Sequence, residues 1–298
     1  MGCVPGQLPG PGRGRVPRGG CVGAGRKDGS VVTSRRVTGD SGSAGSVAAA
    51  VTRAEVCAIA CAEAWRGDGE ILASPIGVIP TIGARLARAT FEPDLLLTDG
   101  EAMLGQGTWA IGGRPEVIEG WLPYRAVFDL IYNGTRHVMM IPSQIDPHGN
   151  VNISAIGEFS RPRAALLGVR GAPGNTVNHP TSYWVPRHTP RTFVARVDMV
   201  SGVGYDRAAQ AGPAASRYHE LRRVVSNLGV FDFASPDRAM RLVSVHPGVG
   251  VDEVRATTGF DLVIPGDVPQ TRQPSADELR LIRSVIDPGG SRSAEVQQ

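Results

Sequence analysis

Short apolar runs alternate with amphipathic segments across residues 52–287, and this alternation predicts an α/β fold. Residues 52–65 begin with a Thr52–Glu55 capping box followed by apolar side chains at helical spacing, so a helix is expected there. Because short apolar strands separated by helices are typical of parallel sheets, we expect a mostly parallel sheet with helices on its faces. The other expected helices are 83–91, 124–134 and 275–286, and the expected strands are 69–75, 94–100, 136–146, 164–175 (running into a glycine loop), 191–198, 222–233 and 240–249.

Residues 1–50 differ in composition from the rest of the 298-residue chain. They hold 13 of the 39 glycines and show no periodic apolar pattern, so they cannot bury enough surface to order themselves. Seven basic and two acidic residues give this segment a local charge of +5, which leaves the remainder slightly acidic although the whole chain carries +3. We therefore expect a disordered Gly/Pro/Arg-rich extension, or a start codon assigned too early, ahead of one folded domain at 51–298. The slightly acidic domain gives no electrostatic case for nucleic acid.

Several kinds of chemistry are excluded by what the folded part lacks. Lys27 is the only lysine and lies in the extension, so the domain has neither a Schiff-base lysine nor a phosphate-loop lysine. No serine sits in a G-x-S-x-G elbow and the histidines are scattered, so neither a serine hydrolase nor a metal site is expected. Cys57 and Cys61, four residues apart on the first helix, are interpreted as buried reduced thiols of a cytoplasmic protein. No apolar run approaches the roughly 20 residues of a membrane span.

Thr98, Asp99, Gly100 and Glu101 follow directly after the apolar run 95–97. Ligands of open α/β sheets bind where such strands end, so this segment is a candidate for the wall of an active site. In the alternative, structural interpretation, Asp99-Gly100 is a strand-end turn and Glu101 is a solvated charge at the start of a helix. The apolar pattern alone leaves both interpretations open.

A second polar segment, S-Q-I-D-P-H-G-N-V-N-I-S at 143–154, combines a turn with several amides and hydroxyls. Proline, glycine and asparagine are turn residues, so a hairpin explains the stretch from Asp146 to Asn150. The turn does not explain why Gln144 and other polar residues crowd the same place. A ligand-binding role therefore remains as the alternative to a plain hairpin.

A third segment, G-V-R-G-A-P-G-N-T-V-N-H at 168–179, is rich in glycine. Gly168, Gly171 and Gly174 allow close backbone approach, and exposed N–H groups there would suit a phosphate or a developing oxyanion. The spacing is G-x-x-G-x-x-G, which is not the dinucleotide fingerprint, so the signal is weak. His246, in the strand expected at 240–249, is interpreted as a structural histidine rather than a base.

Taken in order, these segments resemble the β-subunit side of family I CoA-transferases of the glutaconate CoA-transferase group. Residues 143–154 are similar to that group's Q-I-D-x-x-G-N-x-N loop, residues 168–175 to its second glycine loop, and residues 229–260 to its C-terminal signature. The resemblance implies an α/β protein with an open three-layer α/β/α sheet of the CoA-transferase (NagB/RpiA-like) fold. It also implies a separate α subunit, an active site between the subunits, and no permanently bound cofactor, with CoA present only as part of the substrate thioester. The substrate- and CoA-binding residues that it implies are Gly100, Gln144, Asn150, Gly168, Arg170, Gly171, Gly174 and Asn175.

One position departs from the family pattern. In the transferases a glutamate in an E-[SN]-G tripeptide attacks the acyl-CoA carbonyl, and Thr98 stands in its place here. A neutral hydroxyl cannot form that mixed anhydride. The phrases G-A-R-L-A-R-A-T-F and L-L-L-T-D-G-E-A, however, resemble the β subunit of actinobacterial steroid-ring hydrolases built on the same scaffold. That subgroup implies an α2β2 heterotetramer that opens the last steroid ring of a cholesterol-derived CoA thioester of the COCHEA-CoA type, by hydrolytic C–C cleavage with the catalytic glutamate on the α subunit.

Two alternatives to a ring hydrolase stay open. The first is a CoA-transferase β subunit that moves CoA between acyl groups, with Glu101 in place of the missing nucleophile. The second is a non-catalytic scaffold subunit that only completes the partner's site. The residues that the hydrolase interpretation places around the site are Thr98, Asp99 and Glu101 as its polar wall, and Trp121, Tyr183 and Trp184 as apolar surface for a fused-ring substrate unless they are ordinary core.

Overall fold

Residues 50–98 and 103–296 are described by the computed structural model, and together they form one compact unit. The extension expected at 1–50 lies outside the described residues apart from Ala50, and so do Asp99, Gly100 and Glu101. What the sequence predicts for those residues therefore stays a prediction. None of the helices in the described ranges is long and apolar enough to span a membrane.

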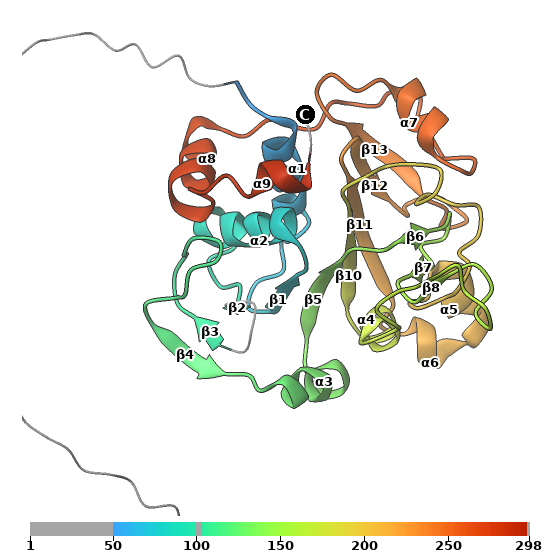
Figure 1. Ribbon diagram of the computed structural model, residues 1–298, viewed down its shortest axis with the longest axis horizontal. Coiled ribbons are helices and arrows are strands. Elements are labelled where there is room, and N and C mark those ends of the chain that lie inside the picture. The colour runs from blue at the N-terminus through green and yellow to red at the C-terminus, as the bar shows by residue number, and fades with distance from the viewer. Residues whose placement is uncertain (1–49, 99–102, 297–298) are drawn as a thin grey trace, which may run out of the picture. The chain divides into compact units, whose positions relative to one another are not determined.

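A six-stranded sheet in the order β1-β5-β10-β11-β12-β13 forms the centre of the fold (Figure 1). Strands β1, β5, β10 and β11 are parallel, whereas β12 pairs antiparallel with both β11 and β13. Leu96, just before β2, makes a parallel bridge to Leu72, which adds a short parallel segment beyond β1. The strands are β1 (Leu72–Pro75), β2 (Leu97–Thr98), β3 (Met103–Gly105), β4 (Ile118–Trp121), β5 (Arg136–Met140), β6 (Gln144–Ile145), β7 (Val151–Asn152), β8 (Ala155–Ile156), β9 (Ala164–Ala165), β10 (Pro180–Val185), β11 (Glu220–Ser226), β12 (Gly229–Asp232) and β13 (Arg241–Val245).

Side chains alternate between two apolar cores along the central strands. On β5, Met139 belongs to one core while Val138 and Met140 belong to the other. On β10, Trp184 and Tyr183 divide in the same way. Because successive side chains of a strand point to opposite faces, this period of two shows that both faces of the sheet are buried.

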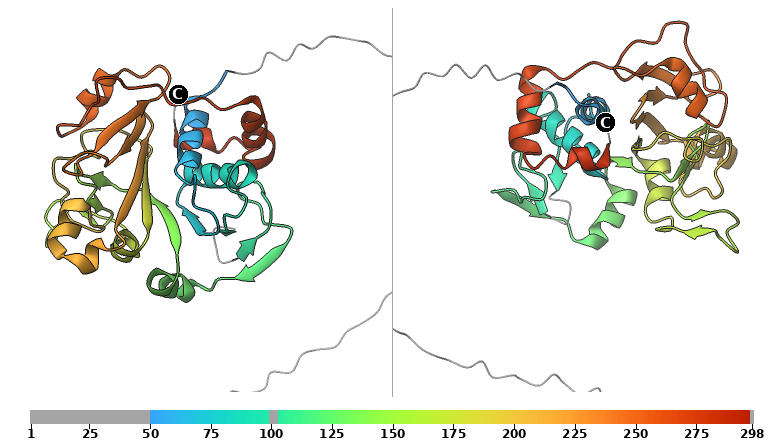
Figure 2. Two further views of the ribbon diagram at one scale, coloured as in Figure 1. Left: turned by 180° about the vertical axis from the view of Figure 1, so that it is seen from behind. Right: turned by 45° about the horizontal axis from the view of Figure 1, so that its top comes forward.

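The helices form the two outer layers around the sheet (Figures 1 and 2). Helices α1 and α2 pack on each other against one core, together with η1 and α9. Side chains from α4 and α7 complete the core on the opposite face. The helices are α1 (Arg53–Glu63), α2 (Val78–Thr90), α3 (Tyr124–Asn133), α4 (Ala172–Asn178), α5 (Tyr205–Ala211), α6 (Pro213–Ser216), α7 (Val251–Thr257), α8 (Ala276–Arg280), the π-helical η1 (Leu281–Ile286) and α9 (Arg292–Glu295).

Several local predictions are confirmed. At the start of α1, the Thr52 hydroxyl accepts from the Glu55 N–H at 3.3 Å, and the Glu55 carboxylate accepts from the Thr52 N–H at 2.9 Å. The same reciprocal capping box starts α8 at Ser275. Helix α3 matches the helix expected at 124–134, and both cysteines of α1 are free and buried.

The helix expected at 83–91 is present but begins earlier, and the strand expected at 191–198 is wrong. Helix α2 begins at Val78 rather than at 83, because Gly77 precedes it with a φ of 103° and Pro80 falls in the first turn. The N–H groups of a first turn have no partner within the helix, so a proline costs little there. The strand expected at 191–198 is reduced to isolated bridges at Phe193 and Val194.

Three further differences concern the glycine segment and the middle of the sheet. The strand expected from 164 covers only Ala164–Ala165, and the following glycine segment enters α4. The single strand expected at 222–233 is a hairpin of β11 and β12. Strand β10 was not predicted, although it pairs with both β5 and β11.

Candidate functional site

The order of the parallel strands reverses between β1 and β5. Counting the segment at Leu96, the five parallel strands lie in the order second, first, third, fourth and fifth along the chain. In such sheets the connections leave on opposite sides of the first and third strands, so a crevice opens at their carboxyl ends. Just beyond these ends, the Ile76 N–H donates to the Met139 carbonyl at 2.9 Å. The topology therefore places the candidate site around Ile76 and Ile141.

Two cavities meet at this point, and Ile76, which is 49% exposed, lines both. The larger, named here the Thr98 cavity, has a volume of about 550 Å³, and the smaller, named the α3–α4 cavity, has about 300 Å³. Small-molecule sites are typically concave, largely apolar and of this size or larger. The Thr98 cavity is lined by Ser74, Pro75, Ile76, Gly77, Val78, Thr81, Arg85, Leu97, Thr98, Ile111 and Gly112, and the α3–α4 cavity by Ile76, Tyr124, Val127, Phe128, Ile131, Arg136, Met140, Ile141, Ile153, Leu167, Arg170, Gly171, Ala172 and Asn175.

Thr98 lies at the end of β2 and pairs with Leu104 of β3. The bridge at Leu96 aligns this segment with β1, so Thr98 reaches the same end of the sheet as the end of β1. The first turn of α2 and, further along the same helix, Arg85 also line the cavity. No described residue that lines the Thr98 cavity is acidic. Within the described chain, the lining of this cavity therefore offers the hydroxyls of Ser74, Thr81 and Thr98 and the cation of Arg85.

Arg85 is the charged group of the Thr98 cavity, and sequence reasoning did not single it out. The residue is only 4% exposed. Its Nη1 donates to the Trp109 carbonyl at 2.8 Å, and its guanidinium carbon lies 4.8 Å from the centre of the Trp109 ring. Burial lowers the pKa of Arg85 to about 10, which leaves it charged at neutral pH. Among the described residues, no carboxylate pairs with it.

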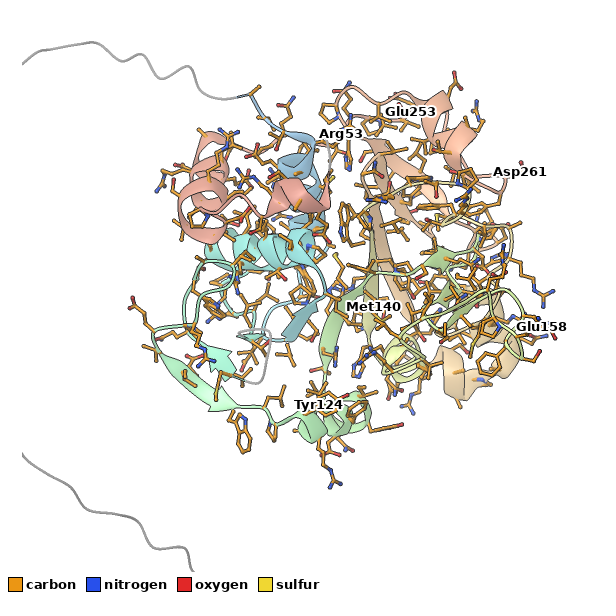
Figure 3. All side chains as sticks on the ribbon, viewed as in Figure 1. Arg53, Tyr124, Met140, Glu158, Glu253 and Asp261 are labelled. Atoms are coloured by element: carbon orange, nitrogen blue, oxygen red, sulfur yellow. The ribbon has the colours of Figure 1, made fainter. Side chains whose placement is uncertain are left out.

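A second buried arginine, Arg136, lines the α3–α4 cavity (Figure 3 labels two other lining residues, Tyr124 and Met140). Arg136 is 6% exposed, and burial lowers its pKa to about 10. Its Nε is buried without a hydrogen-bond partner among the described residues, and so is the Oδ1 of Asn175. The Asn175 Nδ2 is 3.8 Å from the Met140 sulfur. This cavity therefore has a largely apolar lining, and two of its lining residues, Arg136 and Asn175, each carry a buried polar atom without a hydrogen-bond partner among the described residues.

The glycine segment contributes to the α3–α4 cavity at several of the predicted positions. Arg170, Gly171 and Asn175 line it, and Arg170 has a φ of 47°, an unusual backbone conformation for a residue with a side chain. Gly168 has a φ of 83° and open space around it. A Cβ at Gly174 would overlap the Ile131 side chain, so that glycine is required where α4 packs against α3.

Gln144 and Asn150 lie in the β6–β7 hairpin and in neither of the two cavities. The Asn150 Nδ2 donates to Asp146 Oδ2 at 2.9 Å and to Asp206 at 2.7 Å. Its Oδ1 accepts from the Gly204 N–H at 2.7 Å. The Gln144 amide is bonded in the same way to neighbouring residues. Both side chains thus hold the hairpin in place, which the turn interpretation expects for Asn150 and which the sequence left unexplained for Gln144.

The three aromatic residues expected to face a fused-ring substrate lie in different environments. Trp121, on β4, is 68% exposed. Tyr183 and Trp184 are 1% and 0% exposed, one in each core, so they do not form a surface for a ligand. Both residues are buried because β10 lies inside the sheet, where helices cover both faces. Trp184 instead donates through Nε1 to the Glu295 carboxylate at 3.2 Å.

A geometric triad that the sequence did not reveal joins Asp68, His137 and Ser182. His137 Nδ1 lies 2.7 Å from Asp68 Oδ2, and its Nε2 lies 2.9 Å from Ser182 Oγ. Arg222 pairs with the other Asp68 oxygen. Burial lowers the pKa of His137, and His137 and Ser182 are each 0% exposed. A serine that no substrate can reach is not a nucleophile, so this network holds strands together rather than catalysing hydrolysis.

Comparison with known proteins relates this geometry to solved enzymes. No family model matches the chain. The chain is 56% identical over 246 residues to the "Cholesterol ring-cleaving hydrolase IpdB subunit" of Rhodococcus jostii (strain RHA1), covering 83% of this chain and 96% of that protein. It superposes on a chain of the Rhodococcus jostii RHA1 IpdAB crystal structure with a TM-score of 0.80, 56% identity and coverage of 83% of this chain and 99% of that chain.

A more distant match supports the fold. The glutaconate coenzyme A-transferase of Acidaminococcus fermentans gives a TM-score of 0.69 at 22% identity, covering 83% of this chain and 98% of that chain. The expected three-layer CoA-transferase fold is therefore confirmed. With 56% identity over 246 aligned residues that cover 96% of the relative, the chain belongs to the family of cholesterol ring-cleaving hydrolase IpdB subunits.

Proposed function

We propose that this chain is the β subunit of a two-subunit hydrolase that opens the last steroid ring of a cholesterol-derived CoA thioester. The names of its relatives, a ring-cleaving hydrolase subunit and the IpdAB structure, support a hydrolase with a partner. The observation that carries the finer proposal is the Thr98 cavity. It lies at the strand end where a transferase keeps its glutamate, yet its described lining holds three hydroxyl groups and a buried arginine and no carboxylate.

The reaction class requires a base and a cation. Water attacks the ring carbonyl of a β-keto-type thioester, and the base removes the water proton. The C–C bond next to the thioester then breaks, its electron pair becomes an enolate, and a proton completes the product while the water oxygen remains in a new carboxylate. A buried arginine is suited to stabilising the negative charge that develops. We assign this role to Arg85 and the general base to a carboxylate of the partner subunit.

Co-production of this chain with an IpdA-type α subunit tests the proposal. The purified complex should open a steroid-derived bicyclic CoA thioester without any acyl acceptor, whereas this chain alone should be inert. Mass spectrometry of the products separates the two reactions. CoA transfer to added acetate at a rate comparable to ring opening would support the CoA-transferase alternative and contradict the proposal.

Substitutions separate a pocket-forming subunit from a scaffold. Thr98→Val and Arg85→Met should lower kcat of the complex, because both side chains line the cavity. Arg88→Met is the matched control, since Arg88 lies on the same helix and donates to the Gly105 carbonyl at 2.7 Å outside the cavity lining. Unchanged turnover in both cavity variants, with the complex intact by gel filtration, would favour the scaffold alternative. Asp99→Asn and Glu101→Gln extend the same test to the segment after Thr98.

A further inference from the structure

The guanidinium of Arg136 is a buried cation without an anion. It makes no hydrogen bond to any described residue, and its Nε is enclosed without a partner. The residue as a whole is 6% exposed and lines the α3–α4 cavity, and its two terminal nitrogens are not among the fully enclosed atoms without a partner. Removing a charged group from water is costly unless an opposite charge or hydrogen-bond acceptors replace the water. The site is therefore incomplete as the described chain forms it.

The described residues around Arg136 would favour a bound anion, but they include no acidic side chain that could serve as one. None of the described residues that line the α3–α4 cavity is acidic, and Arg170 adds a second cation to the same lining. His179, whose pKa is lowered chiefly by burial, is the nearby titratable group on which Arg136 acts, and its Nε2 already bonds to the Ile131 carbonyl at 3.0 Å. An arginine fork matches a carboxylate in a bidentate arrangement, which is the strongest neutralisation available to it.

The other residues that line the α3–α4 cavity are mostly apolar, so they favour a ligand whose remaining part is apolar. Tyr124 and Phe128 of α3 lie edge to face, with ring centres 5.3 Å apart, and both line the cavity. Leu167, which is 71% exposed, also lines it. A volume of about 300 Å³ lies at the lower end of the range found for small-molecule sites. This is the size of a small ring with a side chain, and the apolar lining disfavours a polyphosphate.

We propose that the α3–α4 cavity is a subsite for an apolar carboxylate, held through a bidentate ion pair with Arg136. This inference rests on the proposed function, because it assigns the carboxylate to the substrate: a ring-bearing CoA thioester that carries a second, free carboxyl group. The Thr98 cavity would receive the reacting thioester, and Ile76, which lines both cavities, would lie between the two ends of the same molecule. An acidic side chain of the partner subunit is the other source of the same chemistry.

The test uses the co-purified complex and two matched thioesters, one with a free carboxyl side chain and one with the corresponding carboxamide. Arg136→Met should raise KM for the carboxylate thioester about 10- to 100-fold, as expected for loss of a charge-assisted pair, and leave KM for the carboxamide nearly unchanged. Arg136→Lys should have a smaller effect, since it keeps the charge and loses the fork. Arg125→Met removes an exposed arginine from the neighbouring α3 and should change neither KM.

Equal KM changes for the two thioesters in Arg136→Met would overturn the proposal. So would loss of the α subunit from a chain that remains folded by circular dichroism, because the anion would then come from the partner. If Arg136→Met does not fold, Arg136→Lys decides through the same comparison of thioesters. Calorimetry with cyclohexanecarboxylate against cyclohexanecarboxamide keeps the subsite testable without turnover. Carboxylate-selective binding that Arg136→Met abolishes would support the subsite even in a complex that opens no ring.

Discussion

Acidification should destabilise the fold through His188. This residue is 4% exposed, and its ring stacks on Phe193 with ring centres 3.6 Å apart. Its Nδ1 lies 3.0 Å from Ser226 Oγ and its Nε2 lies 3.0 Å from Thr258 Oγ1, so it joins the end of β11 to the end of α7. Burial lowers the pKa of His188 to about 3. The His188 imidazole therefore takes up a proton near pH 6.5 in the unfolded chain, but only at a far lower pH in the folded chain.

The sign and size of the effect follow from this difference. The stabilisation is complete above about pH 6.5 and is lost as the pH falls toward the folded-state pKa, because only the unfolded state binds the proton in that range. At pH 4.5 the unfolded histidine lies about two units below its pKa, which corresponds to about 3 kcal/mol from His188 alone. His246 adds to the same trend, since burial lowers its pKa to about 4.

Urea unfolding at pH 7.5 and at pH 4.5 measures this contribution. His188→Gln removes the titrating ring, so its free energy of unfolding should fall between the two pH values by about 3 kcal/mol less than that of the natural chain. The variant will be less stable at pH 7.5, but that offset cancels in the comparison of the two pH values. An unaltered pH dependence in His188→Gln would refute the reasoning.

Three further predictions concern stability and reactivity. Gly204→Ala places a carbon against a backbone carbonyl and a backbone nitrogen that cannot move aside, and should cost at least about 2 kcal/mol in urea unfolding; an unchanged midpoint would contradict this. Asp68→Asn removes the carboxylate that His137 and Arg222 share. The free energy of unfolding should fall by about 3 kcal/mol, which thermal unfolding would show as a lower Tm. Burial raises the pKa of Cys57 and Cys61, so iodoacetamide mapped by mass spectrometry should modify them only after unfolding, and fast modification of either in the native protein would show the α1 packing to be wrong.

Local signals were enough to place the ends of several helices. The capping boxes at Thr52 and Ser275 satisfy backbone N–H groups with side chains a few residues away, so the sequence alone contains the whole interaction. The sequence did not predict strand β10, because its pattern lacks such a local signal. Its residues Thr181 and Ser182 are polar yet fully buried, so no periodic apolar pattern results; the Ser182 hydroxyl pairs with His137, 45 residues away, and Thr181 donates to the carbonyl of His179. Tertiary context of this kind cannot be read from a short window.

The sequence predicted where the candidate site lies better than it predicted which residues line it. The apolar run ending at Thr98 indicated a strand end that lines a cavity. Arg85 and Arg136 were missed because arginine is common, and what distinguishes these two is burial without a carboxylate among the described residues. Tyr183 was misjudged because an aromatic residue suits a ligand surface and a core equally well, and only the neighbouring strands decide between them.

The central claim is that this chain forms the wall of the site while the decisive carboxylate belongs to its partner. The most direct test is the intact mass of this subunit, measured while the complex turns over its CoA thioester. The account predicts an unmodified subunit at every time point, because Thr98 has no carboxyl group from which the mixed anhydride and the enzyme–CoA thioester of the transferases could form. A CoA thioester on this chain, mapped to Glu101, would contradict the account and identify a transferase.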